Sequence, residues 1–473
     1  MSDQIILGAM FRAVGAYPSG WRYPGAHNNP LDDTAVLRKT AKLAEAAKLD
    51  YIFFGDWLAT GHDLEFRDPY LLARIDPLSA ITYLAGVTKK IGLIATANTT
   101  YTDVYALARA TASVDRLSGG RAGLNLVTGA EPRAAGNHGR DAHWGNEHRY
   151  DQAGEFVDAL RLLWDTWEDD AFVRNREDGV LIDPTKVHKA QYGGEHVRVA
   201  GALNVVRPVQ GQLPIVHAGT SLRSRQLVRD EADLALVALP SLSEAVAFTR
   251  QLKQEALNVG RDPAQIKVIT PVLPIVAETQ AEAWEIFDTL ISLVPLDDGG
   301  ELSKAEDFPK GRSIRALSPV VGVALGPRDL DDPVPVRVAA RFSDVGKQLL
   351  ETIASRTGRR IGSASRPVTY RHLLVTHVIP STVIVGDAQA IADHFELWFT
   401  SGAVDGFNVL TAFMNEQFEA FTTLVVPELQ RRGLFRTEYT GRTLRDHLGL
   451  DRPRNLHTVE REQREAAERV RSA

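Results

Sequence analysis

Short apolar segments alternate with longer amphipathic segments along most of the chain, and this alternation constrains the fold more than any other feature. Eight segments predict strands, because they are short apolar runs rich in β-branched residues. These strands span residues 5–9, 51–54, 91–96, 122–128, 213–218, 232–238, 266–276 and 404–410. Between them, the apolar spacing predicts helices over residues 33–48, 77–88, 106–117 and 150–168.

Apolar strands that alternate with helices are typical of parallel βα units, in which both faces of the sheet are covered. About eight such units favour a closed barrel over an open sheet. The competing architecture, a doubly wound sheet, normally carries a glycine-rich dinucleotide motif after its first strand, and residues 8–12 (GAMFR) do not supply one. We therefore predict an α/β protein, a (β/α)8 TIM barrel that occupies residues 1–450.

Three segments do not fit the regular repeat, and we expect them to be insertions in the βα loops. They span residues 129–147, 167–209 and 293–335. Long loops in compact barrels usually carry function, often as lids, and the alternative is a surface excursion or a contact between subunits. Residues 451–473 are rich in charge and predict a separate C-terminal tail.

The composition excludes several classes of function. The chain has no cysteine, which excludes disulfides, thiolate metal sites and cysteine nucleophiles together. Its net charge of −6, without any block of lysine and arginine, gives no electrostatic reason to expect nucleic acid or a membrane as partner. No signal peptide and no membrane-spanning run is evident, so we expect a cytoplasmic protein.

Small polar residues follow the predicted strands, at the end of a barrel where chemistry takes place. They form hydrogen bonds but do not make an obvious acid–base pair, and this profile suits a polar cofactor that carries the chemistry itself. The candidates are Asp56, Asn98, Thr99, Asn125 and Thr128. We assign no catalytic residue from the sequence.

Gly219, Thr220 and Ser221 are a candidate phosphate cradle after the fifth predicted strand. A glycine lets the backbone approach an anion, hydroxyl groups donate to it, and the next helix offers its N-terminus. The alternative is that Ser221 only caps that helix.

Three histidines, His138, His143 and His148, are spaced five residues apart near the first insertion. This spacing does not bring them to one side of a helix, and no carboxylate pattern of a metal motif accompanies them. We therefore expect no metal site.

Several ordered segments resemble the bacterial luciferase-like flavin-dependent monooxygenases, and within them the subfamily of the nitrilotriacetate, dibenzothiophene sulfone and pristinamycin enzymes. The resemblance extends from about residue 5 to 450. The segments that carry it include IGLIATANTTY (91–101), ARATASVDRLSGGRAGLNLVT (108–128), GALNVVRPVQGQLPIVHAGTS (201–221) and VVPELQRRGLFRTEY (425–439).

The resemblance implies reduced FMN as a non-covalent co-substrate, and O2 as the oxidant of a small organic substrate such as a sulfone, a sulfide or an aminopolycarboxylate. It also implies a separate NAD(P)H:flavin reductase that supplies the reduced FMN, and a homodimer or homotetramer. By position, Asp56 and Asn98 or Thr99 would contact the flavin, and Tyr150 and Ser221 its phosphate. Asn125 and Thr128 would line the same pocket.

The sequence departs from the family pattern at four of these positions. Asn146 stands where relatives have a histidine, and it can still donate a hydrogen bond unless His148 takes that role. Relatives have glutamine, serine and glycine in place of His217, Gly129 and Ser224. These departures keep two alternatives open: an oxidoreductase that uses coenzyme F420 on the same barrel, and a flavin-binding protein without activity.

Overall fold

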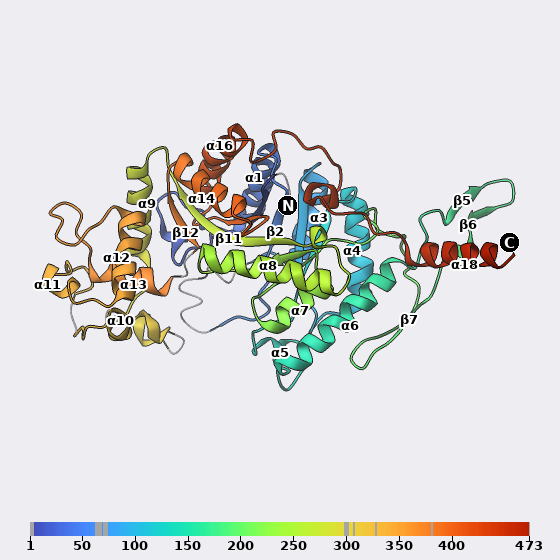
Figure 1. Cartoon of the computed structure of the whole chain (residues 1–473), viewed down its shortest axis with the longest axis horizontal. Helices are drawn as coiled ribbons and strands as arrows, with labels where there is room; N and C mark the ends of the chain where they lie inside the picture. The colour runs from blue at the N-terminus through green and yellow to red at the C-terminus, as the bar shows by residue number, and fades with distance from the viewer. Residues whose placement is uncertain are drawn as a thin grey trace.

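The protein was analysed as a computed structural model, which describes residues 4–61, 69, 74–297, 302–305, 308–326, 329–379 and 382–472. Its centre is a closed barrel of eight parallel strands, each followed by helical or loop segments on the outside (Figure 1). The barrel strands are β1 (Ile6–Met10), β2 (Tyr51–Phe54), β3 (Gly92–Asn98), β4 (Ala122–Val127), β9 (Ile215–Ala218), β10 (Leu234–Leu236), β11 (Lys267–Val276) and β13 (Gly406–Leu410).

Hydrogen-bonded pairing follows the order β1-β2-β3-β4-β9-β10-β11-β13, and β13 returns to β1 in parallel. The predicted TIM barrel is therefore confirmed. All eight predicted strands are present, with ends that differ by at most two residues. The apolar runs are buried because one face of each strand lies inside the barrel and the other packs against helices.

The helices around the barrel begin and end where the local sequence supplies capping groups. Asp76 and Asp103 each accept a hydrogen bond from a backbone amide in the first turn, and Gly119 ends its helix with a φ of 72°. The surrounding helices are α1 (Asp33–Ala46), α3 (Pro77–Val87), α4 (Val104–Ser118), α6 (Asn146–Trp164), α7 (Leu222–Asp230), α8 (Leu242–Asn258), α14 (Ala388–Thr400), α15 (Glu416–Ala420) and α16 (Val426–Arg431), with one π-helix at Phe421–Val425.

One predicted helix is shifted along the chain. The apolar spacing predicted residues 150–168, but α6 starts at Asn146 and ends at Trp164. Its first turn is polar and Gly145 takes the extended conformation before it, so the helix begins ahead of its apolar face. Asn146 and Tyr150 are consequently one turn apart on the same helix.

A short helix, α17 (Leu444–Leu448), closes the amino-terminal end of the barrel. Leu444 and Leu448 pack with inward-facing residues of the strands. Gly92 and Gly123 make room for this contact, because a Cβ at either position would come within 2.4 and 2.7 Å of a Leu444 methyl group. The open end of the barrel is therefore the one at which the strands finish.

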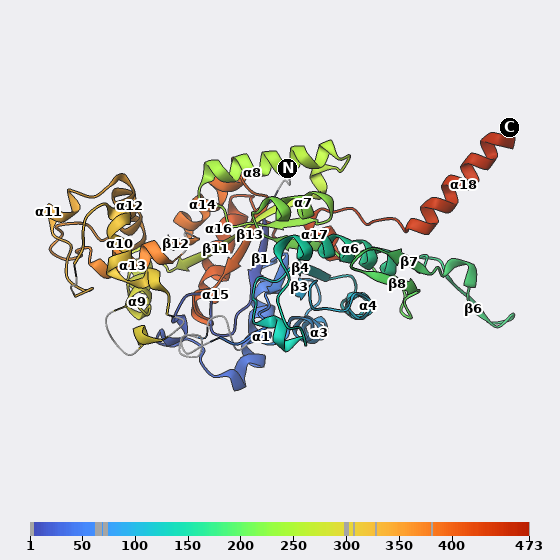
Figure 2. The same ribbon diagram turned by 90° about the horizontal axis from the view of Figure 1, so that it is seen from below.

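The three predicted insertions differ in structure. Residues 129–147 are mostly loop, with a short helix, α5 (Ala134–Asn137). Residues 167–209 form two antiparallel hairpins, β5 (Phe172–Asn175) with β6 (Val180–Ile182), and β7 (Ala190–Gly193) with β8 (Arg198–Gly201). The first hairpin extends away from the barrel (Figures 1 and 2).

The described residues of the predicted insertion 293–335 belong to a larger helical unit that follows β11 and lies beside the barrel (Figure 1). This unit has an apolar cluster of its own, which the sequence had not indicated for this segment. It consists of α9 (Gln280–Leu293), α10 (Ile314–Val321), α11 (Val336–Ala339), α12 (Asp344–Thr357), α13 (Tyr370–Val378) and the strand β12 (Val383–Gly386), which pairs with β11.

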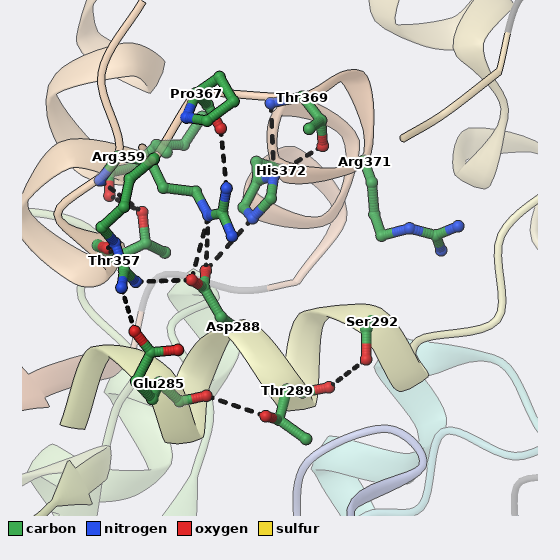
Figure 3. Close-up of polar contacts among 12 residues, drawn as sticks. Glu285, Asp288, Thr289, Ser292, Thr357, Arg359, Pro367, Thr369, Arg371 and His372 are labelled. Carbon is green, nitrogen blue, oxygen red and sulfur yellow. Dashed lines mark hydrogen bonds and ion pairs between the residues drawn. The ribbon is translucent and has the colours of Figure 1, made fainter. Parts of the chain in front are cut away.

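The carboxylate of Asp288 on α9, whose side chain is 10% exposed, connects the parts of this helical unit (Figure 3). It accepts hydrogen bonds from Arg359 (3.0 Å to each oxygen), Arg366 (2.6 Å) and His372 (3.2 Å). Burial alone raises the pKa of Asp288, but the hydrogen bonds from His372 and Arg359 bring it below its usual value.

The predicted C-terminal tail is a helix in this structure, α18 (Leu456–Ser472), which points away from the barrel in both views (Figures 1 and 2). Its first turns are attached to Glu168, which accepts hydrogen bonds from Thr458 (2.8 Å) and Arg461 (2.5 Å). In the described ranges, no helix combines the length and the apolar character needed to span a bilayer.

Candidate active site

A cavity of about 530 Å³ opens where the barrel strands end, between the loops after β2, β3, β4 and β9 and the first turns of α6 and α7. All predicted site residues except Thr99 and Asn125 line it. Its wall consists of Asp56, Trp57, Leu58, Asn98, Val127, Thr128, Gly129, Ala130, Glu131, Ala134, Asn146, Arg149, Tyr150, His217, Ala218, Gly219, Thr220, Ser221 and Ser224.

Three hydroxyl groups meet at one end of the cavity. Ser221 caps α7, because its Oγ accepts a hydrogen bond from the Ser224 amide at 3.1 Å. Ser224 Oγ lies 3.0 Å from Ser221 Oγ and 2.5 Å from the Tyr150 hydroxyl. Gly219 has a φ of 146°, and a Cβ there would lie 2.4 Å from Ser224 Oγ. The glycine is therefore required for the backbone to approach this cluster.

The cluster has the features of an anion site, because hydroxyl donors and the N-terminus of α7 face the same space. The predicted cradle of Gly219, Thr220 and Ser221 lies here, together with Tyr150. Ser224 also belongs to the site but was noted from the sequence only as a departure from the family pattern. It is the third helical residue after the cap Ser221, which is the signal that could have identified it.

Asn98 and Thr128 lie at the ends of the neighbouring strands β3 and β4. Asn98 is buried, and its side-chain oxygen accepts from the Thr100 amide at 3.0 Å. Gly129 has a φ of 71°, and a Cβ at this position would approach the Asn98 amide nitrogen to 2.4 Å. The serine found here in relatives would therefore not fit this local geometry.

The two remaining predicted residues lie behind the cavity wall. Thr99 is buried and points its hydroxyl towards the Val127 carbonyl at 3.4 Å. Asn125 donates to Thr96 at 2.9 Å, and its side-chain oxygen is buried without a hydrogen-bond partner in the described part of the chain. Both support the wall and do not line the cavity.

Two carboxylates of the wall differ in environment. Burial raises the pKa of Asp56, although the Trp57 amide donates to it at 2.8 Å. The Arg133 side chain donates to Glu131 and lowers the pKa of that carboxyl group. Asp56 is therefore the carboxyl group of this wall that more readily holds a proton.

His217 is a second residue that the sequence had marked only as a departure. Its Nδ1 lies 2.8 Å from the Leu126 carbonyl, so Nδ1 carries the proton and Nε2 is left as an acceptor. Nε2 is buried and has no partner among the described residues. Burial lowers the pKa of His217, so the ring is neutral near pH 7. The cavity wall thus contains an acceptor without a donor.

The three evenly spaced histidines do not come together at one point, because two of them contact the same tyrosine and the third contacts other residues. His138 stacks on Tyr101 with ring centres 4.5 Å apart, and His143 is hydrogen-bonded to the Tyr101 hydroxyl at 2.7 Å. His148 packs against Trp144 and His196 instead. Within the described ranges, no three histidine or acidic side chains are placed to hold a metal ion.

A parallel (β/α)8 barrel with polar residues around a cavity at the strand ends is the usual arrangement of a barrel enzyme. The sequence model of the luciferase-like monooxygenases matches residues 17–405. The chain therefore belongs to the luciferase-like monooxygenase family.

Two relatives and one solved structure illustrate the similarity. Nitrilotriacetate monooxygenase component A from Aminobacter aminovorans is 37% identical over 96% of this chain and 98% of its own length. N-acetyl-S-(2-succino)cysteine monooxygenase from Bacillus subtilis (strain 168) is 35% identical, with the same coverage of both chains. A riboflavin lyase, solved with modified FMN and riboflavin, is 25% identical, with a TM-score of 0.74 over 95% of this chain and 97% of that one. The related enzymes are monooxygenases, and this chain is accordingly an oxidoreductase of the monooxygenase type.

Proposed function

We propose that this protein is the oxygenase component of a two-component system, which uses reduced FMN and O2 to oxygenate a small organic substrate that contains sulfur or nitrogen. A separate NAD(P)H:flavin reductase would supply the reduced FMN. The observation that carries the proposal is the anion site formed by Tyr150, Ser221 and Ser224 at the N-terminus of α7. This site lies inside the barrel cavity, in a chain that belongs to a family of monooxygenases.

The residues present fit a phosphorylated flavin. The hydroxyl cluster and Gly219 leave room for a phosphate close to the backbone, and His217 offers an unpaired acceptor. Reduced FMN, when bound, supplies the electrons that activate oxygen. The protein holds the phosphate through Tyr150, Ser221 and Ser224 and keeps the ring at the strand ends.

The remaining wall residues have supporting roles in this proposal. Asn98, Thr128 and Asp56 offer hydrogen-bonding groups to the ring at the strand ends, and Asn146 offers an amide next to Tyr150. Apolar residues of the wall keep water away from the reacting atoms. These are Leu58, Val127, Ala130 and Ala134.

The first experiment tests the phosphate site. In Ser221→Asp the helix cap is retained, but a negative charge faces the phosphate, so we expect FMN affinity to fall about 100-fold in a fluorescence titration. Ser241→Asp is a matched control, because Ser241 caps α8 in the same way and does not line the cavity. Unchanged FMN affinity in Ser221→Asp would refute this phosphate assignment.

The second experiment tests the activity. Oxygenated product should form only when the protein, a flavin reductase, NADH, FMN, O2 and a substrate are present together, because free reduced FMN consumes oxygen without the protein. Hydride transfer with coenzyme F420 and no oxygen uptake would instead identify the alternative oxidoreductase, and FMN binding without turnover the inactive flavin-binding protein. Cytoplasmic location and a homodimer or homotetramer stay predictions of the family resemblance.

A further inference from the structure

Arg149 is a buried cation in the wall of the same cavity. It is 9% exposed, and it is the sole lysine or arginine among the described residues that line this space. Its hydrogen bonds are long, 3.4 Å from Nη1 to the Thr128 carbonyl and 3.3 Å from Nη2 to the Asn146 side-chain oxygen. Its Nε is buried and has no partner among the described residues.

No carboxylate of the described chain forms an ion pair with Arg149, whereas three other arginines of this region are paired with carboxylates. On the same helix, Arg161 lies 2.6 Å from Glu231. Arg133 is bound to Glu131, and Arg223 pairs with Asp151 at the surface. Arg149 differs from these three arginines because its guanidinium lies in the cavity wall and no described carboxylate reaches it.

A guanidinium taken out of water without a counter-charge costs several kcal/mol in order-of-magnitude terms, and buried charges are normally paired. The two carboxylates of the cavity do not pair with it, because Glu131 is occupied by Arg133, and the charged groups that act on Asp56 are Asp76, Arg74 and His138. No counter-charge for Arg149 is therefore found among the described residues, and an anionic ligand in the cavity would supply one.

The position of Arg149 connects it to the hydroxyl cluster. Its neighbour in the first turns of α6 is Tyr150, whose hydroxyl contacts Ser224, and the Asn146 amide that it contacts lines the same wall. The hydroxyls and the end of α7 are neutral or partial charges, so the only full positive charge of the described wall comes from Arg149.

We propose that Arg149 is the counter-charge of the cofactor phosphate and the residue by which the site distinguishes phosphorylated from unphosphorylated flavin. This inference rests on the proposed function. It adds a specificity residue that the sequence did not indicate, although Arg149 directly precedes a tyrosine that was assigned to the phosphate.

The competing explanation is that Arg149 only fastens β4 to α6, through the Thr128 carbonyl. The two explanations differ in one measurable quantity, the ratio of the dissociation constants for riboflavin and FMN. A phosphate counter-charge changes this ratio, because riboflavin has the same ring without the phosphate. A structural clamp changes both constants together.

The test is fluorescence titration of the full-length protein with FMN and with riboflavin, for wild type, Arg149→Gln and Arg149→Lys. We expect Arg149→Gln to weaken FMN binding about 100-fold, the usual size for loss of a buried charged partner, and to change riboflavin binding less than about threefold. Arg149→Lys keeps the charge and should recover part of the lost ratio.

Arg161→Gln is the matched control on the same helix, because Arg161 does not line the cavity and should leave the ratio unchanged. An equal loss for FMN and riboflavin in Arg149→Gln, or no loss, overturns the inference. If Arg149→Gln does not fold, Arg149→Met takes its place in the same titrations, and an unchanged ratio of the two dissociation constants in that variant overturns the inference. Wild-type protein that binds neither flavin would instead overturn the proposed function itself.

Discussion

Two regions of this molecule hold partly or fully buried arginine side chains, and only one of them also holds the carboxylates that pair with them. In the helical unit beside the barrel, Arg359 and Arg366 both reach Asp288 (Figure 3). At the barrel mouth, Arg149 has two long hydrogen bonds and no described carboxylate. The first region is complete without any ligand, whereas the second has a positive charge left for one.

The difference teaches how each region is stabilised. In the Asp288 cluster, the charged groups contact one another in place of water, so their charges are paired within the folded chain itself. His372 illustrates this, since its Nδ1 accepts from Thr369 and its Nε2 donates to Asp288. The mouth tolerates unpaired groups, such as Arg149 Nε and His217 Nε2, which a ligand can satisfy.

The largest expected effect comes from a substitution that disrupts the Asp288 cluster. Asp288→Asn takes their shared carboxylate away from two partly buried arginines, so we expect a loss of about 2 to 3 kcal/mol in the free energy of unfolding, measured by urea denaturation. Glu285→Gln is the control, because Glu285 pairs with Arg366 but its side chain is 67% exposed, and surface pairs contribute about 1 kcal/mol or less. Equal losses in the free energy of unfolding would contradict the expected difference between these two variants.

A smaller effect is expected at the mouth. In the ligand-free protein, Arg149→Gln relieves the cost of an uncompensated cation and loses two weak hydrogen bonds, so the free energy of unfolding should stay the same or rise. Arg161→Gln should cost more, because it leaves Glu231 without its partner. The same urea titrations measure both. A greater loss for Arg149→Gln than for Arg161→Gln would mean that Arg149 belongs to the fold.

The smallest effect is a pH dependence that comes from His217. Burial lowers its pKa in the folded protein, so below the ordinary histidine value of about 6.5 the unfolded chain binds a proton that the folded chain does not. This contribution makes stability fall as the pH drops through that value, until the folded pKa is passed. His217→Gln should show a shallower fall between about pH 7.5 and 5.5.

His377 provides the control for this measurement, because it is exposed on α13 and lies away from the cavity. His377→Gln should follow the wild-type pH profile. If the profile of His217→Gln also coincides with that of wild type, His217 is not the buried neutral histidine that its contact with Leu126 indicates.

The barrel and most of the candidate site could be predicted from local sequence. Each strand is a buried apolar run, and each helix shows its own spacing, so the alternation alone predicts parallel βα units. Parallel strands in a barrel all finish at one end, which is why residues as distant as Asp56 and Ser221 could be placed in one cavity. The predicted start of α6 was wrong because the first turn of the helix is polar and so lies outside the apolar pattern.

Partnerships between distant residues were decided only by the tertiary structure. Asp288 meets groups 71, 78 and 84 residues further along the chain, in a stretch for which the sequence predicted no element. In the sequence, Arg149 cannot be told from the arginines that have partners. Only the folded structure shows that no described carboxylate pairs with it. Local pattern determines secondary structure because it reflects burial of neighbouring residues, whereas the pairing of a buried charge depends on which side chains the folded chain brings within a few ångströms of it.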